Sequence, residues 1–148
     1  MNGPVELRPV TPGCWRGLGG RRRPIFSQFE RPGEDGLDAW DVDRLIDLSR
    51  DLPVSEVALT SIGEIDSAYW FIGNDHAPTV RVLVEHMRLV LDVDPSYPII
   101  LGADGRVMDG MHRIARALLV GESTIRAVQF EVQPEPDYRD CSPEGLPY

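Results

Sequence analysis

Apolar residues recur along the chain with two spacings, one typical of helices and the other typical of strands. Between residues 38 and 52 they recur at helical intervals, and Pro53 ends the pattern, which predicts a first helix. The segment from Val54 to Ile62 alternates apolar and polar residues, as a half-buried strand does. A second helix is predicted from Pro78-Thr79 onward, because six apolar residues form one stripe there: Val80, Leu83, Val84, Met87, Val90 and Leu91.

The region from 97 to 130 predicts a strand–hairpin–helix–strand unit. Asp104-Gly105 suits a tight turn between two short apolar strands. A helix is then predicted between Gly110 and Gly121, since a glycine commonly ends a helix and apolar residues fall on one side: Ile114, Ala117, Leu118 and Val120. Residues 124–130 are predicted to form a further strand. Strands and helices in this order predict a small α/β (α+β) domain.

The predicted domain occupies residues 37–133 and is flanked by two segments of different composition. Residues 1–36 hold seven Gly and five Pro without sustained periodicity, so we expect an irregular or partly disordered N-terminal arm. Residues 134–148 hold four Pro and four acidic residues, which favours an extended C-terminal tail. A chain of 148 residues with 42% hydrophobic residues suffices for one core of ordinary size.

The charge of the chain argues against nucleic acid as the main partner. The formal net charge is -9, and residues 1–36 carry +2 while the remaining 112 residues carry -11. Duplex binding depends on many contacts from Lys and Arg to phosphates, which so acidic a chain opposes. The one basic cluster, Arg21 to Arg23, lies in the Gly- and Pro-rich arm. A solvated, mobile tail is its simpler interpretation, and contact with nucleic acid or an acidic partner is the alternative.

The remaining sequence signals concern location and metals. No apolar run approaches the roughly 20 residues that span a bilayer, and no secretory apolar core begins the chain, so we expect a cytoplasmic protein. Cys14 and Cys141 lie near opposite ends, where free thiols are the simpler interpretation and a disulfide is the alternative. No Cys or carboxylate spacing completes a zinc site around His76 and His86, so no metal site is predicted.

The predicted helix start at Gly110 has the ingredients of an anion site. Backbone N–H groups of Met111 and His112, the helix dipole and the side chains of His112 and Arg113 would converge there on a phosphate. The alternative is a surface His beside a salt-bridged Arg, although a cation at this end opposes the dipole. Asp109 would either cap the helix or position a metal–nucleotide.

The sequence Asp109-Gly110-Met111-His112-Arg113, followed by Arg116-Ala117, resembles the motif of the ParB/sulfiredoxin-like superfamily. Residues 57–62 are similar to its first strand and following turn, and residues 78–90 to the helix before its hairpin. The resemblance covers roughly residues 54–130. It implies a small domain with a mixed sheet and flanking helices, and a bound nucleotide (ATP, ADP or CTP) accompanied by Mg²⁺.

Two departures from that superfamily narrow what the resemblance implies. Met111 stands where sulfiredoxins carry their catalytic cysteine, and a thioether cannot act as a thiolate nucleophile. Chromosome-partitioning ParB proteins have Gly-Glu-Arg-Arg where this chain has Gly110 to Arg113. Their helix-turn-helix domain does not fit in the 18 residues that follow Phe130. The chain therefore resembles the catalytic or nucleotide-binding module alone.

In free-serine kinases of this superfamily, an acidic residue just after the first strand acts in catalysis. Asp66 corresponds to it by position better than Glu64, so one of these two would orient or deprotonate an acceptor. We therefore expect a protein that binds a nucleotide or another phosphate-bearing ligand and, if it is an enzyme, a nucleotide-dependent phosphotransferase or nucleotide hydrolase. A non-catalytic binding module, with a protein partner or as a homo-oligomer, is the alternative, and the acidic charge disfavours a nuclease. The residues Tyr69-Trp70-Phe71 would pack in the core or a lid, or stack on a base.

Overall fold

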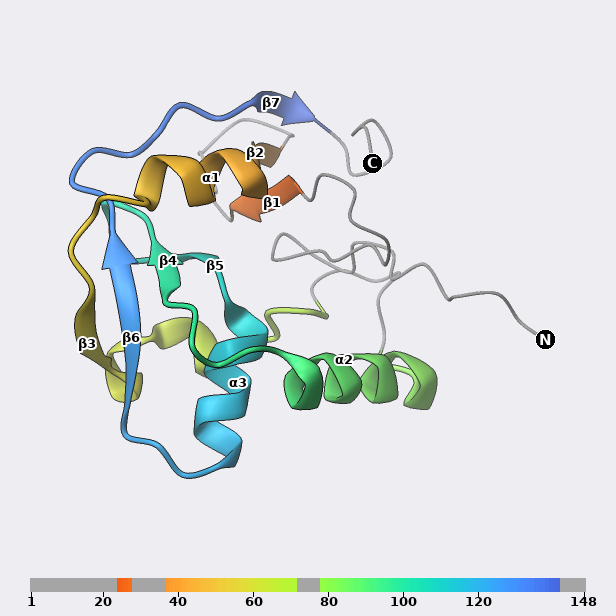
Figure 1. The fold of residues 1–148 in the computed structure, drawn as a ribbon. Helices are drawn as coiled ribbons and strands as arrows, with labels where there is room; N and C mark the ends of the chain where they lie inside the picture. Colours follow the sequence, from red (N-terminus) through yellow and green to blue (C-terminus); the bar gives the residue numbers. More distant parts are fainter. Residues whose placement is uncertain (1–23, 28–36, 72–77, 142–148) are drawn as a thin grey trace.

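The computed structural model describes residues 24–27, 37–71 and 78–141, and Figure 1 shows their arrangement. These residues form three α-helices: α1 (Val42–Ser49), α2 (Val80–Asp92) and α3 (Met111–Leu119). They also form seven strands: β1 (Pro24–Ser27), β2 (Leu37–Asp41), β3 (Ser55–Ala58), β4 (Ile99–Leu101), β5 (Val107–Asp109), β6 (Thr124–Gln129) and β7 (Tyr138–Cys141). Two 3₁₀ turns, η1 (Leu59–Ser61) and η2 (Gly63–Asp66), follow β3.

The central sheet has the strand order β3-β6-β4-β5. β3 is antiparallel to β6 and β4 is antiparallel to β5, whereas β4 and β6 run parallel. The parallel pair arises because β5 and α3 carry the chain back before β6 begins, as a crossover must. The predicted α+β class is therefore confirmed, with a mixed sheet of four strands and three helices in the described residues.

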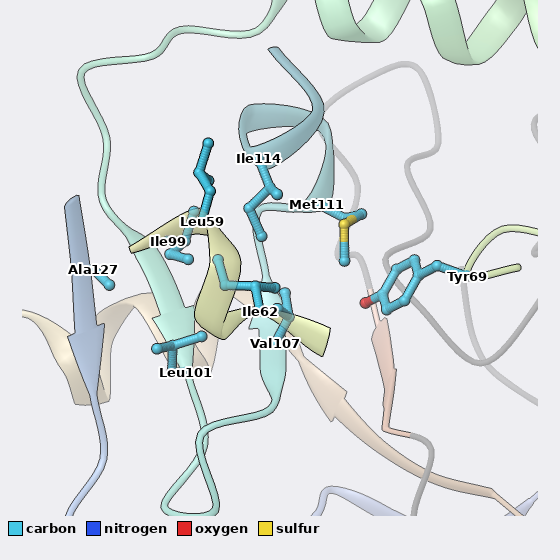
Figure 2. Packing of buried hydrophobic residues seen from close by; sticks show 9 residues of the cluster. All are labelled: Leu59, Ile62, Tyr69, Ile99, Leu101, Val107, Met111, Ile114 and Ala127. Carbon is cyan, nitrogen blue, oxygen red and sulfur yellow. The ribbon is translucent and has the colours of Figure 1, made fainter. Parts of the chain in front are cut away.

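Two apolar cores lie on opposite faces of the central sheet. Ile99 and Leu101 face one core while Ile100 between them faces the other, as alternation along a strand requires. The first core packs α3 against the sheet (Figure 2) and contains Leu59, Ile62, Tyr69, Ile99, Leu101, Val107, Met111, Ile114 and Ala127. The second packs α1 against the other face and contains Trp40, Val42, Leu45, Ile100, Met108, Val128 and Phe130. In Figure 1, α1 lies above β4 and β5 and α3 lies below them.

The first helix is shorter than the sequence predicts. Residues 37–41 form β2, and α1 begins only at Val42 and ends at Ser49, within the predicted 38–52. Asp41 decides the start, since its carboxylate accepts hydrogen bonds from the backbone N–H groups of Asp43 (2.9 Å) and Arg44 (3.4 Å). The predicted strand 54–62 is likewise shorter, because the chain turns into η1 after β3.

The second helix forms where it is predicted, but much of its apolar stripe is exposed. Thr79 caps α2 by accepting a hydrogen bond from Val82 N at 3.2 Å. Val80 is 78% exposed and Met87 and Leu91 are each 60% exposed. The buried side chain of α2 is His86, which lies on the face toward α3. A polar residue within an apolar pattern thus marks the inner face of this helix.

Both flanking segments contribute a strand to a second, three-stranded sheet of order β1-β2-β7. β1 falls within the predicted arm and pairs with β2 from Pro24↔Asp41 to Ser27↔Asp38. β7 falls within the predicted tail and pairs with the other edge of β2. Pro134 also accepts a hydrogen bond from Trp40 Nε1 at 2.9 Å. Residues 134–141 are therefore held against β2 and, through a hydrogen bond from Arg44 Nη1 to the Glu135 carbonyl, against α1, while the division at residues 36 and 133 stays a prediction.

Two further predictions meet the structure only in part. No helix of the described residues is long and apolar enough to cross a membrane. A pairing of the two cysteines lies outside what the structure describes, because Cys14 falls in residues 1–23.

Candidate functional site

The β4–β5 hairpin carries an irregularity that decides where Asp109 lies. Ile100 pairs with Asp109. The next residue of β4, Leu101, pairs with Val107, so Met108 is an extra residue in β5. A bulge of this kind shifts the alternation of the strand by one residue. Strict alternation would place Asp109 on the face of Val107, in the α3 core, but Asp109 instead lies beside Ile100 at a pocket on the α1 face.

Gly110 joins β5 to α3 in a conformation that favours glycine. Its φ of 112° lies in the left-handed region. A Cβ at this position would lie 2.6 Å from Ile99 Cγ2 and 2.9 Å from Arg113 Nη2, so internal packing also requires glycine. α3 begins at Met111 with Gly110 as its N-cap residue and without a side-chain cap. The alternative in which Asp109 caps the helix is therefore wrong.

Asp109 and Arg113 form a buried ion pair. Arg113 Nη2 donates to Asp109 Oδ2 at 2.7 Å, and the two side chains are only 9% and 6% exposed. Asp109 thereby offsets the cation that stands in the first turn of α3, where the helix dipole opposes positive charge. Arg113 Nε is buried and has no hydrogen-bond partner among the residues that the structure describes. A donor of this guanidinium is therefore left unused by the described chain.

A pocket of about 520 Å³ opens beside the ion pair, between α1, the C-terminal end of α2 and the central sheet. Most of its walls are apolar side chains, which include Val42 and Ile46 of α1 and Ile100 and Val128 of the sheet. Five charged residues also line it: Asp43, Arg50, Asp94, Asp109 and Arg113. The pocket thus combines an apolar interior with charged groups, as small-molecule sites commonly do.

Two of the charged lining residues have partners of their own. Arg50 is exposed and forms an ion pair with Asp47 at 2.5 Å. Asp94 accepts hydrogen bonds from the Ser96 hydroxyl at 2.6 Å and the Ser96 N–H at 2.9 Å. These bonds hold the pKa of Asp94 below its ordinary value, so the carboxylate is ionised at neutral pH. Arg113 is therefore the buried cation of the pocket.

His112 belongs to a second cluster, between α2 and α3. His86 Nδ1 and His112 Nε2 lie 3.0 Å apart and share one hydrogen. The Trp70 ring stacks on both imidazoles, with centroid separations of 4.4 Å to His86 and 4.8 Å to His112, and Phe71 meets His86 edge-on at 5.5 Å. Burial lowers the pKa of His86 to about 4, so its imidazole is neutral near pH 7.

This stack fastens α2 to the first turn of α3. A second link lies one turn further along α3, where Arg116 Nη1 donates to the backbone carbonyl of Leu91 near the end of α2. His86 Nε2 is buried without a hydrogen-bond partner in the described residues. The two histidines therefore hold the helices together, and neither lines the pocket.

The structure separates the residues that the sequence grouped into one phosphate site. Asp109 and Arg113 line the pocket, and Gly110 lies buried beside them. Met111 is 4% exposed in the first core, and Figure 2 shows its side chain near Tyr69 and Ile114. Core packing, one of the two expectations for Tyr69, is confirmed by its place in the same cluster.

The two acidic candidates for catalysis lie away from the pocket. Glu64 Oε2 accepts a hydrogen bond from the backbone N–H of Val107 at 3.1 Å, so this carboxylate holds η2 against β5. Asp66 ends η2 and is exposed. Neither carboxylate lines the pocket, whereas Asp43 and Asp94 do.

Several residues of the pocket and the stack are missing from the sequence prediction. Asp43 and Asp94 lie in segments far apart in the chain, and no local pattern indicates that they share a pocket. For Trp70 the sequence predicts either packing or stacking on a base. The structure shows its ring stacked on two histidines. His86 carried a partial signal, as a polar residue inside an apolar helix.

Neither the comparisons with known proteins nor the arrangement of metal-binding side chains assigns a function. No protein-family model, curated protein or solved structure matches the chain. Among the residues that the structure describes, no three His, Cys, Asp or Glu side chains come together as a metal site would require. The functional conclusion therefore rests on the pocket and its chemistry.

Proposed function

We propose that this protein binds a phosphate-bearing small molecule, in first place a nucleotide, in the pocket beside Asp109 and Arg113. One observation carries the proposal: the buried Arg113 lines a pocket of about 520 Å³, and its Nε has no hydrogen-bond partner among the described residues. Such a volume is usual for small-molecule sites. A guanidinium offers five N–H donors in a fork that suits one phosphate group.

The first turn of α3 supports the same class of ligand. Arg113 lies in this first turn, and the helix dipole is positive at this end, which favours a negative charge beside it. Asp109 engages Nη2 of Arg113, which leaves other donors of the same guanidinium for a ligand oxygen. A phosphate would then share Arg113 with Asp109, and the ion pair would stay intact on binding.

The resemblance to the ParB/sulfiredoxin-like superfamily adds candidates for the ligand. We propose on this basis that the chain is a ParB-like domain and that ATP, ADP and CTP, each with Mg²⁺, are the nucleotides to test in the pocket. Magnesium usually keeps several waters and takes one or two carboxylates together with phosphate oxygens. Asp43 and Asp94 are the lining carboxylates outside the ion pair and would serve that purpose. His112, which lies in the stack, would hold α3 in place.

Binding without turnover is the form of this function that the geometry favours. A general base must lie within hydrogen-bond reach of the proton that it removes. Glu64 is engaged by a backbone N–H and Asp66 is exposed, and neither lines the pocket. Phosphoryl transfer or nucleotide hydrolysis is the second candidate, with Asp43 or Asp94 as the nearby carboxylate. It would appear as magnesium-dependent release of ADP or phosphate.

Titration calorimetry on the full chain tests the proposal, with AMP, ADP, ATP and CTP each measured with and without Mg²⁺. Removal of Arg113 alone would break a buried ion pair, which typically costs about 3–5 kcal/mol in stability. The informative variant is the double change Asp109→Asn with Arg113→Gln, which removes both charges; Asn has the shape of Asp, and Gln is a shorter, neutral hydrogen-bonding side chain in place of Arg. It should weaken binding by about 10- to 100-fold, because a charge-assisted contact is worth roughly 1.5–3 kcal/mol.

Arg88→Gln is the matched control, since Arg88 is exposed on α2 and pairs with Glu85 at 3.4 Å. This variant should bind as the unmodified chain does. The proposal is refuted if no phosphate-bearing probe binds, or if the folded double variant binds as tightly as the control.

A further inference from the structure

The pocket has too little positive charge for a chain of phosphates. Among the residues that the structure describes, its charged lining consists of three carboxylates and two guanidinium groups, which leaves a formal charge of -1. Asp94 stays ionised because the Ser96 hydroxyl and N–H hold its pKa down. Each further negative charge on a ligand would meet the same opposing field inside a partly apolar cavity. A polyanion would therefore need a row of cations that the lining does not offer.

The two guanidinium groups differ in what they can bind. Arg50 is exposed and its Nη2 lies 2.5 Å from Asp47 Oδ1. Arg113 is buried at the pocket, and its Nε is without a hydrogen-bond partner in the described residues. Sites that handle triphosphates place several cationic or backbone donors along the phosphates. A single buried guanidinium, already shared with Asp109, matches one phosphate group.

The rest of the pocket is suited to an apolar body. Its volume of about 520 Å³ exceeds what one phosphate fills, and apolar side chains dominate the remaining walls. Ile46 of α1 is 47% exposed and lines the pocket, so a ligand would cover apolar surface that water now meets. Tyr97 lines it as well, at 63% exposure, and offers a ring for flat groups.

We infer that the ligand of this pocket is a monophosphate ester of a flat, largely apolar body, in preference to a di- or triphosphate. The inference rests on the proposed function, because it specifies the ligand of the same site. The phosphate would lie on Arg113 at the start of α3, and the body would lie between Ile46 of α1 and the face of the sheet that carries Ile100.

Four probes test this inference by calorimetry on the full chain: inorganic phosphate, phenyl phosphate, AMP and ATP, the last two with and without Mg²⁺. Phenyl phosphate should bind at least about tenfold more tightly than inorganic phosphate, because the ring buries apolar surface. Without magnesium, AMP should bind at least about tenfold more tightly than ATP. With magnesium, AMP should also bind more tightly than ATP. ATP that binds as tightly as AMP in either condition would overturn the inference and leave the proposed function standing. Binding of none of the four probes would refute the proposed function itself.

Variants separate the two halves of the inference. Ile46→Ser should weaken phenyl phosphate severalfold and leave inorganic phosphate unchanged, since it removes apolar wall alone. Without magnesium, Asp43→Asn combined with Asp94→Asn should raise the affinity for ATP relative to AMP, because it removes two opposing charges. If Ile46→Ser weakens the binding of phenyl phosphate and of inorganic phosphate equally, the apolar-body assignment is overturned. If the double variant Asp43→Asn with Asp94→Asn leaves the ratio of ATP affinity to AMP affinity unchanged, the charge argument is overturned.

Discussion

Acid should destabilise the folded protein through His86. The imidazole is 7% exposed, and its contacts in the described chain are with aromatic and imidazole rings, so burial and not a nearby charge controls its titration. Its pKa falls from 6.5 to about 4 on folding. At about 1.4 kcal/mol per pH unit, this difference corresponds to about 3 kcal/mol.

The sign follows from which state holds more protons. Between pH 6.5 and about pH 4 the unfolded chain protonates His86 while the folded chain keeps it neutral. The free energy of unfolding should therefore fall as the pH is lowered through this window, by up to about 3 kcal/mol from this group. Below about pH 4 both states are protonated, and the contribution of His86 levels off.

Urea denaturation at a series of pH values from 7 to 4 measures this effect. His86→Gln should reduce the loss between pH 6.5 and 4 by up to about 3 kcal/mol, whatever it does to stability at pH 7, while the carboxylate contributions remain in both proteins. Arg88→Gln, at an exposed position of the same helix, is the matched control and should leave the loss in place. Parallel stability curves for the unmodified chain and His86→Gln would refute the burial argument, as would a directly measured His86 pKa near 6.5 by nuclear magnetic resonance.

Two further predictions concern the backbone around the site and are measured by urea denaturation at pH 7. Gly110→Ala should cost about 2–4 kcal/mol, because a Cβ there combines left-handed strain with contacts under 3 Å. Gly121→Ala, which shares a positive φ but has open space, should cost only about 1–2 kcal/mol, and equal losses would contradict the packing argument. Glu64→Ala should cost about 1–3 kcal/mol by leaving a β5 N–H without its acceptor, whereas Glu64→Gln keeps an accepting oxygen. Normal stability of Glu64→Ala would show that this hydrogen bond is dispensable.

The part of the fold that the sequence predicts best is the hairpin and helix between residues 97 and 130. Its signals are local: Asp104-Gly105 turns the hairpin, and Gly105 and Gly121 both have positive φ where the predicted turn and helix end require it. Such residues act on the backbone within a few positions of themselves. Their effect can therefore be inferred without knowledge of the remaining chain.

The second sheet could not be predicted in this way. β2 pairs with β7, and all four strands of the central sheet lie between them in the sequence. Neither β2 nor β7 shows sustained alternation of apolar and polar residues. The sequence wrongly predicts residues 38–41 as helix, because the helical spacing of apolar residues in α1 continues into the segment before it. Only the hydrogen bonds accepted by Asp41 mark the boundary, and the identity of that residue alone does not select it over other aspartates nearby.

The candidate site was predicted in part for a related reason. Asp109 and Arg113 are four residues apart, which places them within reach of each other at a helix start. That both line a pocket depends on the bulge at Met108 and on α1, which the sequence places more than 60 residues away. The same holds for the stack, where Trp70, His86 and His112 come from three separate segments.

The first turn of α3 is held from three directions, and this changes what its motif means. Met111 packs in the core, His112 bonds across to α2, and Arg113 pairs with Asp109 at the pocket. Each contact stabilises the helix start without any ligand. The residues Asp109 to Arg113 therefore have a structural use even in a chain that binds nothing. Only variants that keep this packing while removing the charge of Arg113 separate binding from folding, which is why the neutral pair Asp109→Asn with Arg113→Gln is the decisive one.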